Sequence, residues 1–293
     1  MCADSRRGGD VIQYRLVRVI GGKGLAPDKF TTALRGVAAD RQRQVYAAGD
    51  SEIKVYSESG ELKRRWGTSK PGLSVAVAGD GSVYVGEPAQ IEIFDGAGKL
   101  INTWREAGLL GRVTAIDFAD ACVLAADAAD RAIRRFDRGG KFLNNIGKDN
   151  RMRGFLIPNG VVDFSVDAGG IIHAANPGRH RVERYAPDGE LLGHFGRFDG
   201  IDPAGFPGCC NPTNVAVAGR DRIVVTEKAG PRAKLYDSSG TLLAVVGADV
   251  FDPNCKNMDA AADSSGRIYV ADTVKLVVNV FEAVSDGKGA AEA

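Results

Sequence analysis

The segment Ala260-Ala-Ala-Asp-Ser-Ser-Gly-Arg-Ile-Tyr-Val-Ala-Asp272 consists of two short apolar runs joined by a polar turn. The same pattern occurs as Val75-Ala-Val-Ala-Gly-Asp-Gly-Ser-Val-Tyr-Val85, and again from Val215 to Val225. Alternating small and β-branched residues, bounded by Gly, Asp and Ser, predict pairs of strands joined by tight turns. The abundance of alanine in the first run of each copy suits an innermost strand, where side chains crowd around an axis.

A second motif follows each of these pairs. It consists of an aromatic residue, a short polar turn and a glycine, and its five copies end at Gly60, Gly98, Gly140, Gly189 and Gly240. A glycine at this place fits a hairpin turn that requires a positive φ. Each repeat therefore carries four short strands, at a period of about 40–50 residues, as in β-propellers.

The repeats number six, which predicts an all-β fold: a six-bladed β-propeller of four-stranded antiparallel blades. The last repeat lacks its outer strand, and the segment Tyr14–Gly22 has the pattern of one, so we expect it to pair there and close the ring. The expected organisation is an N-terminal tether over residues 1–10, one propeller over 11–283 and a disordered tail over 284–293.

Two further motifs carry a family resemblance. Ile268-Tyr-Val-Ala-Asp272 ends a strand in an acid, and Asn176-Pro-Gly-Arg-His180-Arg-Val forms a loop followed by a strand. The chain therefore resembles the NHL-repeat family of six-bladed β-propellers. This resemblance implies the fold, whereas function has to be argued from a site.

Charge and hydropathy exclude some classes of partner. Lys and Arg total 38 against 37 Asp and Glu, so the net charge does not favour nucleic acid, and no apolar run reaches the length of a membrane helix. Cys2, followed by small and polar residues, resembles the lipid-bearing first residue of a mature bacterial lipoprotein. We therefore expect an extracytoplasmic location, periplasmic or lipid-anchored through Cys2, with a cytoplasmic chain as the alternative.

Three cysteines provide the main functional hypothesis. Cys209 and Cys210 are adjacent, and alignment of the repeats places Cys210 and Cys255 at the same position of consecutive blades. We predict that these three thiols meet at one rim of the central funnel as metal ligands, with Asp259 and Asn214 completing the cofactor site. Thiolates favour a soft metal ion such as Cu or Zn, or an iron–sulfur cluster.

This centre would serve electron transfer, metal handling or sensing, with a redox or metal-donor protein as partner. Two other states of the cysteines stay open at this point: a disulfide, vicinal or between blades, and thiols without a function.

Two other classes of function remain. A lactonase-like hydrolase would hold Ca²⁺ with axial oxygen ligands. Its candidate ligands are Asn159, Asp163, Asn214, Glu227 and Asp259. The competing interpretation of these residues is hydrogen bonding of loops and strand ends. The third class is a protein-interaction scaffold without a cofactor. We expect Cys122 and the three histidines, His173, His180 and His194, to be structural or exposed.

Overall fold

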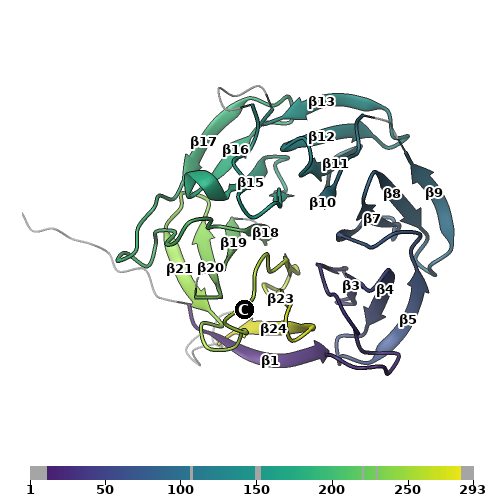
Figure 1. Cartoon of the computed structure of the whole chain (residues 1–293). Coiled ribbons are helices and arrows are strands. Elements are labelled where there is room, and N and C mark those ends of the chain that lie inside the picture. The colour runs from purple at the N-terminus through teal and green to yellow at the C-terminus, as the bar shows by residue number, and fades with distance from the viewer. Residues whose placement is uncertain (1–11, 106–107, 149–152, 220, 229, 285–293) are drawn as a thin grey trace, which may run out of the picture.

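The computed structural model describes residues 12–105, 108–148, 153–219, 221–228 and 230–284. It forms six four-stranded antiparallel sheets arranged as a ring around a central axis (Figure 1). The predicted fold is therefore confirmed. The expected tether with Cys2 and residues 285–293 of the expected tail lie outside the described residues.

Blades 1 to 5 each run from an inner to an outer strand in chain order. Blade 1 comprises β2 (Gly36–Ala39), β3 (Val45–Gly49), β4 (Glu52–Tyr56) and β5 (Leu62–Gly67). Blade 2 comprises β6 (Ser74–Val77), β7 (Val83–Glu87), β8 (Gln90–Phe94) and β9 (Leu100–Trp104). Blade 3 comprises β10 (Val113–Ala119), β11 (Cys122–Asp127), β12 (Ala132–Asp137) and β13 (Phe142–Ile146).

The second half of the ring follows the same order. Blade 4 comprises β14 (Phe164–Val166), β15 (Ile172–Asn176), β16 (Arg181–Tyr185) and β17 (Leu191–Phe195), with the 3₁₀ turn η1 (Pro177–Arg179) between its middle strands. Blade 5 comprises β18 (Asn214–Ala218), β19 (Arg222–Glu227), β20 (Arg232–Asp237) and β21 (Leu242–Val246). Blade 6 comprises β22 (Ala260–Ala262), β23 (Ile268–Asp272), β24 (Val277–Ala283) and β1 (Tyr14–Gly21).

The ring closes through the first strand of the chain. β1 pairs antiparallel with β24, from Tyr14 opposite Ala283 to Gly21 opposite Val277, and so supplies the outer strand of blade 6 (Figure 1). This confirms the predicted closure, in which β1 pairs with the edge that β24 would otherwise leave open. No helix of the described residues is long and apolar enough to cross a membrane.

The repeated glycine and aromatic motifs pack against each other across neighbouring blades. Gly98, in the outer turn of blade 2, has a φ of +90°, and a Cβ built there would lie 2.5 Å from the ring of Trp66 at the end of β5. Gly140 stands in the same relation to Trp104 of the preceding blade, with 2.7 Å to the ring. All five turn glycines have a positive φ, and at Gly98, Gly140 and Gly240 the absence of a Cβ also leaves room for an aromatic ring of the preceding blade.

Polar side chains near the axis join neighbouring blades. The Thr114 hydroxyl of blade 3 donates to the Val162 carbonyl of blade 4 at 2.6 Å, and the Val215 amide of blade 5 donates to Asp163 at 2.6 Å. The Val37 amide of blade 1 donates to Asp259 of blade 6 at 2.7 Å. Burial of apolar side chains between the sheets provides the larger stabilisation, about 1.5–3 kcal/mol for each large side chain.

Candidate functional site

Two cavities lie end to end on the propeller axis. The first, which we call the axial channel, has a volume of about 300 Å³ and is lined by inner-strand residues of all six blades. The second, the upper funnel, has a volume of about 260 Å³ and is lined mainly by the loops that enter the inner strands. Asn214 lines the funnel and Val215 lines the channel, as do Thr114 and Ala115, so the cavities adjoin.

The upper funnel combines basic and neutral polar side chains. Its polar lining residues are Thr32, Arg35, Arg112, Thr114, Asn214, Lys256, Asn257 and Thr273. No aspartate or glutamate is among the described residues that line it. The side chains of its three cations, which come from blades 1, 3 and 6, are exposed and form no ion pair with any described residue. Their positive charge is therefore available to a ligand.

Asn214 lies at the junction of the two cavities. It is only 3% exposed, and its side-chain Oδ1 is buried without a hydrogen-bond partner among the described residues. Burial raises the pKa of both Asp163 and Asp259, and hydrogen bonding from the Asn214 side chain opposes part of this rise. An amide nitrogen committed to the channel carboxyls leaves the amide oxygen to accept a hydrogen bond from a bound molecule.

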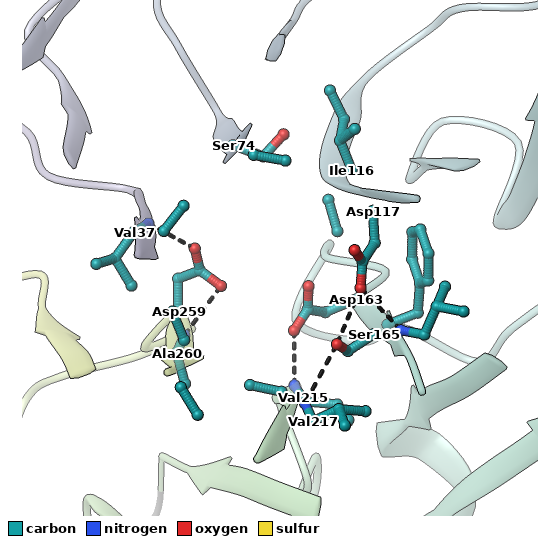
Figure 2. Close-up of a pocket in the computed structure, with 18 of the residues that line it drawn as sticks. Val37, Ser74, Ile116, Asp117, Asp163, Ser165, Val215, Val217, Asp259 and Ala260 are labelled. Carbon is teal, nitrogen blue, oxygen red and sulfur yellow. Dashed lines mark hydrogen bonds between the residues drawn. The ribbon is translucent and has the colours of Figure 1, made fainter. Parts of the chain in front are cut away.

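The axial channel is acidic. Asp117, Asp163 and Asp259 line it, and none of its described lining residues is basic (Figure 2). Asp163 accepts from the Val215 amide and Asp259 from the Val37 amide, while Asp117 accepts from Ser165 at 3.0 Å (Figure 2). These contacts fix each carboxyl against the next blade.

Burial controls the protonation of these carboxyls. Desolvation raises the pKa of Asp163 well above its ordinary value, and the neighbouring negative charge of Asp259 raises it further. Desolvation also raises the pKa of Asp259, to about 7. Like charges that share a poorly solvated space disfavour double ionisation. At neutral pH the channel therefore retains at least part of a proton.

The strand-end residues singled out in the sequence have structural roles. Glu227 is fully buried and pairs with Lys234 at 2.7 Å and Arg232 at 2.6 Å, within its own blade. Asp272 accepts from the backbone amides of Asp252, Val274 and Lys275. Of the five candidate oxygen ligands, Asp163, Asn214 and Asp259 meet at the axis, whereas Glu227 is engaged elsewhere.

Asn159 contacts the lining of the upper funnel through Asn257. Its amide donates to the Asn257 side chain, at 2.8 Å.

The three cysteines occupy two different environments. The sulfurs of Cys209 and Cys210 lie 2.9 Å apart, with Cys209 exposed and Cys210 buried. Cys255 is fully buried in the apolar cluster between blades 5 and 6, and its thiol donates to Asp272 at 3.3 Å. No hydrogen bond among the described residues links Cys255 to the pair.

The described residues do not support the predicted metal or cluster site. They contain no group of three or more His, Cys, Asp or Glu side chains arranged to hold a metal ion. A thiol that donates to a buried carboxylate, as Cys255 does, is committed to a local structural contact. The three-thiol centre thus finds no support, and the roles proposed for Asp259 and Asn214 as its ligands stay predictions.

The histidines and Cys122 are placed as expected. His173 is buried in β15, with Nε2 2.9 Å from Asp167, and the ring of His180 packs edge-on against Phe198. His194 is exposed in β17, and Cys122 is buried at the start of β11. None of the three histidines lines either axial cavity.

Sequence reasoning missed the basic side chains of the funnel. Arg35, Arg112 and Lys256 each lie one to three residues before the first axial position of an inner strand, at Gly36, Thr114 and Asp259. Their common place in the loop that enters an inner strand could have revealed them, because these loops lie on one face of the ring.

Comparison with known proteins gives the fold alone. No protein-family model matches the sequence, and no curated protein matches it. Among solved structures, a catalytically inactive variant of virginiamycin B lyase from Staphylococcus aureus, with quinupristin, is similar. Its TM-score is 0.63, with 10% identity over 93% of this chain and 100% of that one.

Two other solved structures are similar over most of this chain. A protein of unknown function from Bacteroides thetaiotaomicron has a TM-score of 0.72 and 15% identity, covering 93% of this chain and 76% of that chain. A streptogramin B lyase has a TM-score of 0.60 and 12% identity, covering 86% of this chain and 93% of that chain. The chain is a six-bladed all-β propeller with structural neighbours that include these lyases.

Proposed function

We propose that this propeller binds a small organic anion in the upper funnel. The observation that carries the proposal is the convergence of Arg35, Arg112 and Lys256, without a counter-ion among the described residues, around a cavity of about 260 Å³. Charged groups that line a recess on one face concentrate ions of opposite sign there. Guanidinium groups in particular match the geometry of carboxylates and phosphates.

The floor of the funnel adds a second requirement. Asn214 offers a buried acceptor oxygen, and the channel below is lined by carboxyls. A ligand that enters with a second anionic group would meet the acidic channel. The chemistry therefore favours a compact molecule with a carboxylate or phosphate at one end and an N–H or O–H donor at the other. A buried acceptor left unpaired costs about 1–3 kcal/mol, which such a donor would recover.

The proposal concerns binding and not lyase chemistry. The neighbouring virginiamycin B lyase is catalytically inactive when one of its own histidines is replaced by alanine. In this chain His173, His180 and His194 lie away from both cavities, so the likeness provides no histidine for catalysis.

Three finer hypotheses from the sequence stay proposals. Membership of the NHL-repeat family rests on the strand-end acids and on the Asn176–Val182 loop and strand. The lactonase-like alternative keeps Asp163, Asn214 and Asp259 as axial oxygen atoms, but the first and last already accept backbone hydrogen bonds between blades. The soft-metal or iron–sulfur function is the least supported, since the thiols are divided between two environments.

Calorimetric titration with a panel of small carboxylates and phosphates, with and without a hydroxyl or amino group, tests the proposal. We expect at least one donor-bearing anion to bind, and Arg112→Gln to weaken that binding about tenfold or more, the magnitude of one charge-assisted hydrogen bond. The matched control is Lys99→Gln, which removes an exposed cation from an outer turn and should leave affinity unchanged. No binding by the panel, or equal losses in both variants, would refute the funnel as the site.

A further inference from the structure

The loop that enters blade 5 contains a pair of adjacent thiols with unequal access to solvent. Cys209 is exposed, whereas Cys210 is 3% exposed, and their sulfurs are in contact at 2.9 Å. The loop is anchored on both sides of the pair: Asn211 donates to the Pro207 carbonyl at 2.8 Å and accepts from the Lys228 amide at 2.9 Å. The thiols are thus held together by a fixed loop, with one sulfur facing solvent.

The surroundings give the two thiols different acidities. The hydrogen bond with Cys210 lowers the pKa of Cys209, and the nearby positive charge of Lys228 lowers it further. Burial raises the pKa of Cys210, and its hydrogen bond with Cys209 adds to this. The exposed thiol is therefore the one that more readily becomes the nucleophilic thiolate, and the buried thiol keeps its proton.

The separation of the sulfurs disfavours metal chelation by the pair. A thiolate–zinc bond is about 2.3 Å long, so two sulfurs on one tetrahedral ion lie about 3.8 Å apart. If the two sulfurs bound one ion in linear coordination with bonds of that length, they would lie about 4.6 Å apart. The observed 2.9 Å is closer to the approach of two sulfurs about to bond than to either chelate.

We propose that Cys209 and Cys210 form a redox-active dithiol that undergoes exchange with a low-molecular-weight disulfide. The Cys209 thiolate attacks one sulfur of the disulfide, RS–SR, so that a Cys209–SR bond forms and one RS⁻ leaves. Cys210 then loses its proton to solvent and attacks the sulfur of Cys209. A Cys209–Cys210 bond forms and the second RS⁻ leaves, so that two protein thiols are oxidised and one disulfide is reduced to two thiols.

Adjacency in the chain makes this oxidation readily reversible. Neighbouring Cα atoms across a trans peptide are about 3.8 Å apart, which is shorter than the roughly 4.4–6.8 Å usual for disulfides. The resulting ring is strained, and strained, exposed disulfides are the labile ones. A labile bond on a surface loop suits a redox response rather than a permanent staple, which would add little stability to so short a loop.

The test is the reaction of the full chain with 5,5′-dithiobis(2-nitrobenzoate), in a Cys2→Ser background so that only the other thiols report. We expect a fast phase that releases two thiolates of the reagent per chain. The protein product should be lighter by two hydrogens, with a disulfide between Cys209 and Cys210 within one peptide. With Cys210→Ser the fast phase should release one thiolate and leave a stable adduct on Cys209. With Cys209→Ser its rate should fall at least tenfold.

The control variants are Cys122→Ser and Cys255→Ser, which remove buried thiols and should leave the fast phase unchanged. A persistent adduct on Cys209 in the parent protein would overturn the proposal, because Cys210 would then fail to resolve it. Equal reaction rates at all thiols would overturn it as well. Neither outcome depends on a ligand in the funnel.

Discussion

Replacing Asp259 by asparagine should change how the stability of the propeller depends on pH. In the folded chain burial raises the pKa of Asp259 to about 7, from an ordinary value of 3.8. Between these two values the unfolded chain releases a proton that the folded chain keeps. The free energy of unfolding therefore falls as pH rises through this window, and it levels off above pH 7.

The magnitude follows from the size of that interval. At about 1.36 kcal/mol for each pH unit, the full interval corresponds to roughly 4 kcal/mol. Asp259 is only partly buried and faces a cavity that admits water, so we expect about half of this, on the order of 2 kcal/mol. The asparagine of the variant would still accept from the Val37 amide, and the substitution removes the charge that raises the pKa of Asp163.

The measurement is urea unfolding at pH 4.5 and 7.5, followed by the fluorescence of Trp66 and Trp104. The free energy of unfolding of Asp259→Asn, taken relative to that of the parent protein, should be about 2 kcal/mol higher at pH 7.5 than at pH 4.5. Asp188→Asn, which removes a carboxylate from an exposed outer turn, is the matched control and should show little change. If the difference between Asp259→Asn and the parent were the same at both pH values, the carboxyl would not retain a proton in the channel.

Further changes probe the packing and the site. Gly98→Ala should lower the free energy of unfolding by about 2–4 kcal/mol, because it adds a clash with Trp66 to the cost of a positive φ. Gly81 has a φ of +86° and no atom within 4 Å of a new Cβ, so Gly81→Ala should lower the free energy of unfolding by only about 1–2 kcal/mol in the same assay. Lys234→Met should destabilise the chain by about 3–5 kcal/mol, because among the described residues it leaves the fully buried Glu227 with Arg232 as its one ion-pair partner. An unchanged urea midpoint would contradict this. Binding of any anion that the calorimetric panel identifies should weaken as salt rises from 50 to 500 mM, since exposed cations are screened; affinity independent of salt would exclude a role for them.

The fold could be predicted from the sequence because the same residue types recur at the same places in successive repeats. The aromatic residue and glycine of the outer turn recur in blades 1 to 5, and alanine recurs in the inner strands of all blades except blade 4. Even the closing strand was recognisable, since Tyr14–Gly21 carries the outer-strand pattern that blade 6 lacks.

The site was harder to predict because it depends on which side chains turn toward the axis. Repeat alignment placed Cys210 and Cys255 at equivalent positions, but equivalence around a ring does not bring side chains together. Cys255 turns into the packing between blades and toward Asp272, while Cys210 turns toward Cys209. Asp163 and Asp259 were placed correctly at the axis, although their hydrogen bonds to the next blade could not be inferred from spacing.

The pairing of β1 with β24 also determines how the molecule would respond to mechanical load. Tyr14 lies opposite Ala283, so the two ends of the described chain leave the ladder at the same end. Tension applied between them would open the hydrogen bonds one after another, as in unzipping, instead of loading them all at once in shear. The closure that makes the ring complete at rest would thus be the first part to separate under tension, with the five blades formed by contiguous sequence left intact.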